Sequence, residues 1–172
     1  ELACDGLAGV SASQVEIQSG IQFYDGMSTA DIQGILVKSA SDLIDLESPN
    51  YQYVAARLLL FGLRKNLYGR LHELPVLIEQ IKRGVGKGIY DGDILKKYTE
   101  TEIESLDNII DHHRDYLFTY AGLRQVVDKY LVQDRSSGDV YETPQFMYML
   151  IAMTIFAEYP PESRLDHVIR YY

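Results

Sequence analysis

Apolar residues recur at helical spacing along almost the whole chain, and this period restricts the fold more than any other feature. Helices with such a stripe bury it against a neighbouring element. Ser28 can cap a helix, and Asp31 would lie in its positively polarised first turn. The first clear stripe consists of Ile32, Ile35, Leu36, Leu43 and Ile44. We therefore predict a helix that begins at Ser28 or Thr29.

Helix signals continue to the end of the chain. Further starts are predicted at Ser48-Pro49, Pro75, Asp93, Thr101, Thr119, Thr143-Pro144 and Ser163. Gly69 and the Pro160-Pro161 pair are predicted stops. Residues 131–142 contain two short β-like runs around a turn rich in Asp, Ser and Gly. The sequence predicts a mainly α, bundle-like fold with one short β-hairpin near residues 131–142.

Composition excludes several classes of protein. The 172 residues include 16 Lys and Arg against 25 Asp and Glu, which gives a net charge of −9. An acidic chain has no cationic excess for nucleic acid or for an anionic membrane surface. The most apolar stretch, Phe146 to Ala157, is shorter than the roughly 20 residues that a spanning helix needs. Cys4 is the only cysteine, which excludes an internal disulfide. We expect a soluble, cytoplasmic protein that binds neither nucleic acid nor membrane.

Two segments superficially resemble sites for catalysis or ligand binding. The run Asp111 to Asp115 contains His112 and His113, but on a helix these two imidazoles point about 100° apart. We interpret this run as a solvated helix end and predict no metal site. The glycines of residues 84–88 lack the strand, spacing and Ser or Thr of a phosphate-binding loop. No serine or cysteine stands in a recognisable nucleophile motif, so we predict no catalytic residue.

One pair of residues suggests an anion site. Thr29 lies at a predicted helix start, where free N–H groups and the helix dipole favour negative charge. Lys65 lies late on the next long helix. If the two helices pack antiparallel, Lys65 returns toward Thr29 and completes a phosphate site. The alternative is a plain helical hairpin without a ligand.

Several segments carry a family resemblance that covers essentially the whole chain. They are Gln22–Ile32, Tyr51–Leu58 with Arg64-Lys65, Lys129–Arg135, Tyr141–Phe146 and Ser163–Tyr172. Together they resemble the large subunit of class I ribonucleoside-diphosphate reductase, from its ATP-cone into its helical N-terminal domain. The resemblance implies cone helices in residues 1–70, without the cone's front β-hairpin, and the helical domain in residues 71–172. Both ends of the chain then look like cuts within a longer protein.

The resemblance also implies site residues. Thr29 matches the cone's nucleotide-contacting threonine, and Lys65 matches its phosphate-contacting lysine. Gln33 stands where other members have His or Asp, and Gly62 replaces a His. Both departures remove groups that hold the effector, so Gln33 is at most a weak contributor. ATP and dATP are the implied allosteric effectors, and the segment itself carries no cofactor.

The implied parent enzyme reduces ribonucleoside diphosphates for deoxyribonucleotide biosynthesis by a radical mechanism. Its implied partners are the remainder of the large subunit, a radical-generating small subunit and a second large subunit. Its essential thiols belong to a downstream ten-stranded barrel, so this regulatory and structural segment is expected to be inactive alone. The alternatives are a stand-alone nucleotide-sensing or small-subunit-docking module, or a purely structural helical domain. Met147, Met149 and Met153 are then either ordinary core or a face that the barrel covers.

Overall fold

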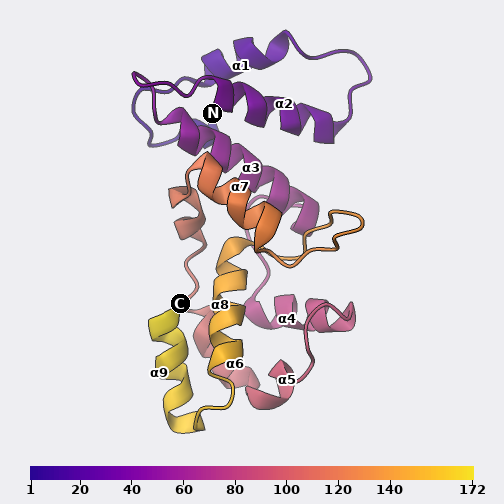
Figure 1. The fold of residues 1–172 in the computed structure, drawn as a ribbon, viewed down its shortest axis with the longest axis vertical. Helices are drawn as coiled ribbons and strands as arrows, with labels where there is room; N and C mark the ends of the chain where they lie inside the picture. Colours follow the sequence, from indigo (N-terminus) through magenta and orange to yellow (C-terminus); the bar gives the residue numbers. More distant parts are fainter. The chain divides into compact units, whose positions relative to one another are not determined.

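The computed structural model describes residues 1–172, and its secondary structure consists of helices joined by turns and loops (Figure 1). The α-helices are α1 (Ala12–Gly20), α2 (Thr29–Asp42), α3 (Tyr51–Tyr68), α4 (Leu77–Gly86), α5 (Ile94–Lys97), α6 (Glu100–Asp107), α7 (Tyr120–Lys129), α8 (Pro144–Ile155) and α9 (Pro161–Tyr171). Two 3-10 helices, η1 (Leu2–Cys4) and η2 (His112–Leu117), complete the secondary structure. The predicted mainly α class is confirmed. None of the helices combines the length and the apolar character needed to cross a membrane.

The chain forms two compact units. The first contains Glu1–Gly69 and His113–Tyr130, and the second contains Arg70–His112 and Leu131–Tyr172. Each unit is therefore built from two stretches of chain. The division into family domains at residues 70 and 71 stays a prediction.

Helix α3 is the central element of the first unit. It packs against α2 on one side and α7 on another. Ala56 and Leu60 of α3 form a buried cluster with Leu123 of α7, and the two leucines have no exposed surface. Burying a leucine side chain contributes about 1.5–3 kcal/mol. This apolar contact holds α3 against α7.

Most of the predicted helix boundaries are confirmed within a few residues. Ser28 caps α2, and its Oγ accepts from the Asp31 N–H at 3.1 Å. Thr119 caps α7 in the same way, and Gly69 ends α3 with a φ of 72°, a conformation that favours glycine. Helix α6 begins at Glu100, earlier than the predicted Thr101, because Thr99 is its cap and forms a capping box with Glu102.

The start of one helix and the presence of another differ from the sequence prediction. Helix α3 begins at Tyr51 rather than at Ser48-Pro49. Helix α1 has no predicted counterpart. Its apolar residues do not form a single stripe, since Val15 is buried while Ile17 is 70% exposed.

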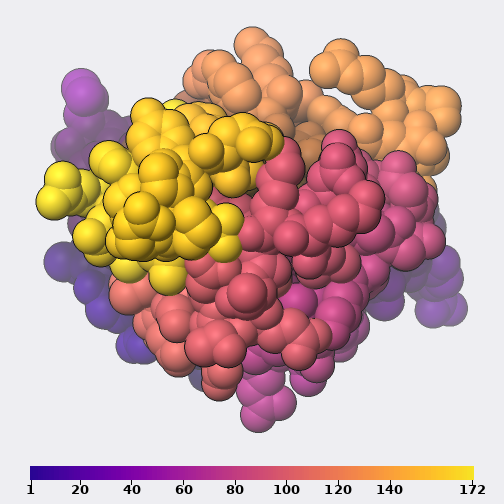
Figure 2. All heavy atoms as spheres, turned by 90° about the horizontal axis from the view of Figure 1, so that it is seen from below, coloured from indigo at the N-terminus to yellow at the C-terminus, as the bar shows by residue number.

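Helix α8 supplies much of the core of the second unit. Met147, Met149 and Met153 are all buried, so these methionines are core within this chain. Helix α9 packs against α8 and α6, and Figure 2 shows α9 in yellow beside the rose surface that includes α6. Arg164 of α9 donates to Glu102 of α6 through one edge of its guanidinium, with Nε and Nη2 at 3.0 and 2.7 Å from Oε1. This ion pair is nearly buried and fixes the two helices together.

The predicted β-hairpin at residues 131–142 is reduced to one antiparallel bridge, between Gln133 and Val140. The Asp134 N–H donates to the Asp139 carbonyl at 2.8 Å, and Gly138 adopts a φ of 79° in the turn. The turn chemistry that the sequence indicates is therefore present. Regular strands do not form around it.

Candidate functional site

Thr29 is the first residue of α2, and its side chain is exposed. Ser28, not Thr29, provides the side-chain cap, and its hydroxyl also donates to Asp31 Oδ2 at 2.6 Å. The Thr29 hydroxyl is therefore not used as the helix cap. It lies at the helix end where backbone N–H groups are not satisfied within the helix.

Lys65 lies in the last turn of α3 and is exposed. Its carbonyl accepts from the Gly69 N–H at 2.8 Å, which closes the helix. Its ammonium group takes part in none of the ion pairs of the structure. The positive charge is thus available to an anionic ligand.

Gln33 sets the register between α2 and α3. Its Nε2 donates to the Leu58 carbonyl at 2.6 Å. Its Cγ lies 2.9 Å from where a Cβ on Gly62 would stand, so the helices approach closely at that glycine. Figure 1 shows α2 and α3 side by side. The two helices are in contact, and Figure 1 shows that they run in opposite directions, as the predicted site requires.

This register brings Thr29 and Lys65 to the same end of the helix pair. Thr29 lies four residues before Gln33, which is about 6 Å along α2 at 1.5 Å per residue. Lys65 lies three residues after Gly62, which is about 4.5 Å further along α3. Because the two helices run in opposite directions, both displacements lead to the same end of the pair. A phosphate group bound at the start of α2 would therefore lie beside the part of α3 that contains Lys65. Their joint role as a binding site stays a prediction.

The side-chain amide of Gln33 does not point toward the end of the helix pair where Thr29 and Lys65 lie. The amide is engaged by the Leu58 carbonyl, and the aliphatic part of the side chain fills the space that Gly62 leaves open. The side chain acts as a spacer between the helices. Its predicted weak contribution to a ligand remains untested.

The run Asp111 to Asp115 does not form a cluster of ligands. The His112 ring packs edge-on against Phe146, with centroids 4.8 Å apart, and the His113 ring lies 5.8 Å from that of Tyr116. Asp115 is fully buried and pairs with Arg64, so the interpretation of this run as a solvated helix end is wrong at Asp115. No group of three or more His, Cys, Asp or Glu side chains converges anywhere in the chain.

Sequence reasoning missed a buried polar network in the second unit. Glu142 is 1% exposed and accepts hydrogen bonds from the Tyr90 hydroxyl at 2.6 Å and the Val132 N–H at 2.9 Å. Burial raises the pKa of the Glu142 carboxyl, although both hydrogen bonds oppose that shift. Gln80 joins the network by donating to the Tyr90 hydroxyl at 2.8 Å. No local pattern in the sequence could have revealed it, because its members lie up to 62 residues apart.

Comparison with known proteins assigns the chain to a family. Residues 116–172 match the family model described as the ribonucleotide reductase, all-alpha domain. The chain is 49% identical over 170 residues to ribonucleoside-diphosphate reductase 1 subunit alpha of Escherichia coli K12, which covers 99% of this chain and 22% of that protein. It is 46% identical over 166 residues to the alpha subunit of enterobacteria phage T4, covering 95% of this chain and 22% of that subunit.

A more distant relative gives the same result. The alpha subunit of Helicobacter pylori is 36% identical over 152 residues, covering 88% of this chain and 18% of that subunit. The chain thus spans about a fifth of the length of these relatives. The similarity extends over nearly all residues of the chain, which belongs to the ribonucleoside-diphosphate reductase alpha-subunit family, as a segment of such a subunit.

Proposed function

We propose that this chain is a regulatory and structural N-terminal segment of a ribonucleotide reductase large subunit. The parent enzyme would reduce ribonucleoside diphosphates to deoxyribonucleotides by a radical mechanism, together with a radical-generating small subunit. The similarity over 99% of the chain to alpha subunits named ribonucleoside-diphosphate reductase carries this proposal. The other partners would be the remainder of the large subunit and a second copy of it. Its compartment would be the cytoplasm.

The segment alone would be catalytically inactive. Reduction of a ribonucleotide at the expense of thiols needs a pair of cysteines, and Cys4 is the only cysteine here. Burial raises the pKa of the Cys4 thiol, which lowers its thiolate fraction and its reactivity. The chemistry would therefore reside in the rest of the parent subunit.

The regulatory part of the proposal concerns the shared end of α2 and α3. A nucleotide effector, ATP or dATP, would place a phosphate against the first N–H groups of α2 and the Thr29 hydroxyl. Lys65 would supply the compensating positive charge from α3. The register fixed by Gln33 against Leu58 and Gly62 supports this arrangement. Gln33 would support the site by spacing the helices.

A titration followed by amide NMR tests the location of this site. We expect ATP and dATP to shift the amide signals of residues 26–33 and 62–69 with one saturating curve. Lys65→Ala should abolish the saturation, because the phosphate loses its nearest cation. Lys129→Ala is the matched control, since Lys129 also lies exposed in the last turn of a helix of the first unit. Shifts that survive in Lys65→Ala would place the nucleotide elsewhere.

The alternative is a stand-alone module that senses nucleotides or docks the small subunit. Joining the chain to the remainder of its parent separates the two cases. If Lys65→Ala changes the ATP response of the parent's reductase activity, the segment regulates catalysis. An unchanged response, with binding lost, would favour the stand-alone module.

A further inference from the structure

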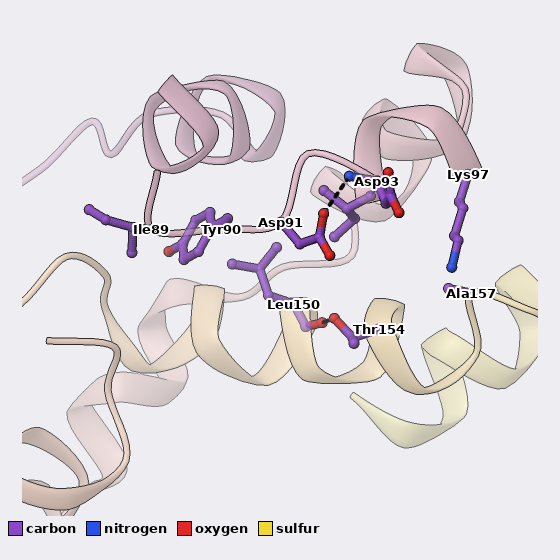
Figure 3. Close-up of a pocket in the computed structure, with 9 residues that line it drawn as sticks. Ile89, Tyr90, Asp91, Asp93, Lys97, Leu150, Thr154 and Ala157 are labelled. Carbon is purple, nitrogen blue, oxygen red and sulfur yellow. Dashed lines mark hydrogen bonds between the residues drawn. The ribbon is translucent and has the colours of Figure 1, made fainter. Parts of the chain in front are cut away.

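A pocket of about 270 Å³ opens in the second unit, between the segment at residues 89–97 and helix α8 (Figure 3). Its apolar lining comes from Ile89, Ile94, Leu150 and Ala157, together with Tyr90. Its polar lining comes from Asp91, Asp93, Lys97 and Thr154. The volume is slightly below the usual range of sites for drug-sized molecules, which begins at about 300 Å³. Only a compact ligand fits.

The charges around the pocket leave one carboxylate without a direct ion-pair partner. Lys96 pairs with Asp93 at 2.7 Å, and Lys97 pairs with Glu158. Asp91 is in no direct ion pair, although its charge acts on both lysines from a longer distance. Its Oδ1 accepts from the Asp93 N–H at 2.9 Å. Figure 3 shows the Asp91 carboxylate directed toward Leu150 and Thr154 of α8. Its other oxygen remains available to a donor in the pocket.

Thr154 adds an acceptor on the opposite wall. Its hydroxyl donates to the Leu150 carbonyl at 2.7 Å, one turn earlier on α8. The proton of that hydroxyl is thus used within the helix, and the oxygen lone pairs remain. Asp91 and Thr154 both present acceptors, so a ligand here must bring donors.

Tyr90 makes one wall of the pocket rigid. Its hydroxyl is held by Glu142 and Gln80, as described above. Its ring lies directly against Gly84, where an added Cβ would stand 2.0 Å from the ring carbon Cδ2. A wall that is already fixed loses little conformational freedom when a ligand binds.

We propose that this pocket binds a small organic cation, namely a primary ammonium on a compact apolar body. The ammonium donates to Asp91 and Thr154, and the body packs between Ile94 and Leu150 beside the Tyr90 ring. A neutral molecule of the same shape lacks the charge that Asp91 complements. Lys97 also lines the pocket, but its charge is paired with Glu158, which leaves Asp91 as the lining charge without a direct partner. The proposal is independent of the nucleotide site, which lies in the first unit.

Benzylammonium is the probe, and amide NMR on the 172-residue chain is the measurement. We expect saturable shifts at residues 89–97 and 150–157, with a dissociation constant in the millimolar range because the carboxylate is exposed. Benzyl alcohol, the neutral isostere, should bind about fivefold more weakly, the factor expected for one exposed ion pair. Asp91→Asn should weaken benzylammonium by the same factor and leave benzyl alcohol unchanged.

Two controls and one comparison complete the experiment. Asp166→Asn removes the same charge from α9, outside the pocket lining, and should leave binding unchanged. Ala157→Leu fills the pocket and should abolish binding of both probes. Absence of saturable shifts, equal affinity for the two probes, or full binding in Asp91→Asn would each overturn the proposal. Tighter binding of n-butylammonium than of benzylammonium would also overturn it, in favour of a lysine side chain from another protein.

Discussion

Arg64 Nη2 lies 3.0 Å from Asp115 Oδ2, and the two side chains are only 4% and 0% exposed. The pair joins α3 to η2 inside the first unit. Arg64 Nη1 also donates to the Tyr116 hydroxyl at 3.3 Å, and the guanidinium lies over the Tyr116 ring. A buried charge is tolerated only when it is paired and hydrogen-bonded. Each member of this pair therefore depends on the other.

Replacing Asp115 by Asn should destabilise the chain strongly. The substitution keeps the shape but leaves the Arg64 guanidinium buried without its counter-charge, which costs about 3 kcal/mol. Urea denaturation should show a clearly lower midpoint. Asp42→Asn is the matched control, because it breaks the exposed pair with Lys38 and should change stability by less than about 0.5 kcal/mol. Similar midpoints for the two variants would contradict the importance of the buried pair.

Gly62→Ala should reveal the close approach of α2 and α3. The new Cβ would stand 2.9 Å from Gln33 Cγ, so the helices must separate slightly, at a cost of about 1–2 kcal/mol. In a Gln33→Ala background the clash is absent, and the alanine should be neutral or stabilising. Gly34→Ala, which meets open space on α2, should also be neutral or stabilising. Additive effects of Gly62→Ala and Gln33→Ala in denaturation would contradict this contact.

Gly84→Ala should destabilise the second unit. An added Cβ would overlap the Tyr90 ring, and the ring cannot turn aside without breaking its hydrogen bonds to Glu142 and Gln80. We expect a loss of about 2–3 kcal/mol in denaturation. Gly86→Ala, two residues later in the same helix, meets nothing within 4 Å and serves as the control. An equal midpoint for both alanine variants would show that Tyr90 is not held against α4.

Glu142→Gln should change how stability depends on pH. Because burial raises the pKa of Glu142 above its ordinary value of 4.5, the folded state holds this proton more tightly than the unfolded chain. The wild-type chain therefore loses stability as pH rises from about 4.5 through the raised pKa. Glutamine does not titrate, so the variant's stability relative to wild type should increase over that window and then level off. Denaturation at a series of pH values measures the difference, and a constant difference would contradict the raised pKa.

Local signals predicted the helices well. Ser28, Thr119 and Gly69 have the chemistry of caps, and each occupies the cap that its pattern indicated. The predicted start at Thr101 is late, because the capping box of Thr99 and Glu102 begins the helix before it. At residues 131–142 the predicted turn is present, but the predicted hairpin is not. The two runs on either side of the turn form one isolated β-bridge instead of regular strands.

The long-range contacts could not be predicted in the same way. A short connection favours the antiparallel pairing of α2 and α3, and Figure 1 shows that pairing. The joint binding role of Thr29 and Lys65 stays a prediction. The burial of Asp115 did not follow, because its partner Arg64 lies 51 residues away and nothing local distinguishes Asp115 from an exposed helix-end carboxylate. Tyr90 and Glu142 were missed for the same reason, and the pocket depends on how they pack in three dimensions.

Calorimetric titration of the chain with ATP, repeated on Lys65→Ala, decides whether the shared end of α2 and α3 binds a nucleotide. We expect a measurable heat with a single saturating isotherm for the wild-type chain and none for Lys65→Ala. Lys129→Ala should behave like wild type, and both variants should unfold at the wild-type urea midpoint. No heat with the intact chain, or an isotherm unchanged by Lys65→Ala, would contradict a nucleotide-sensing role for the paired ends of α2 and α3.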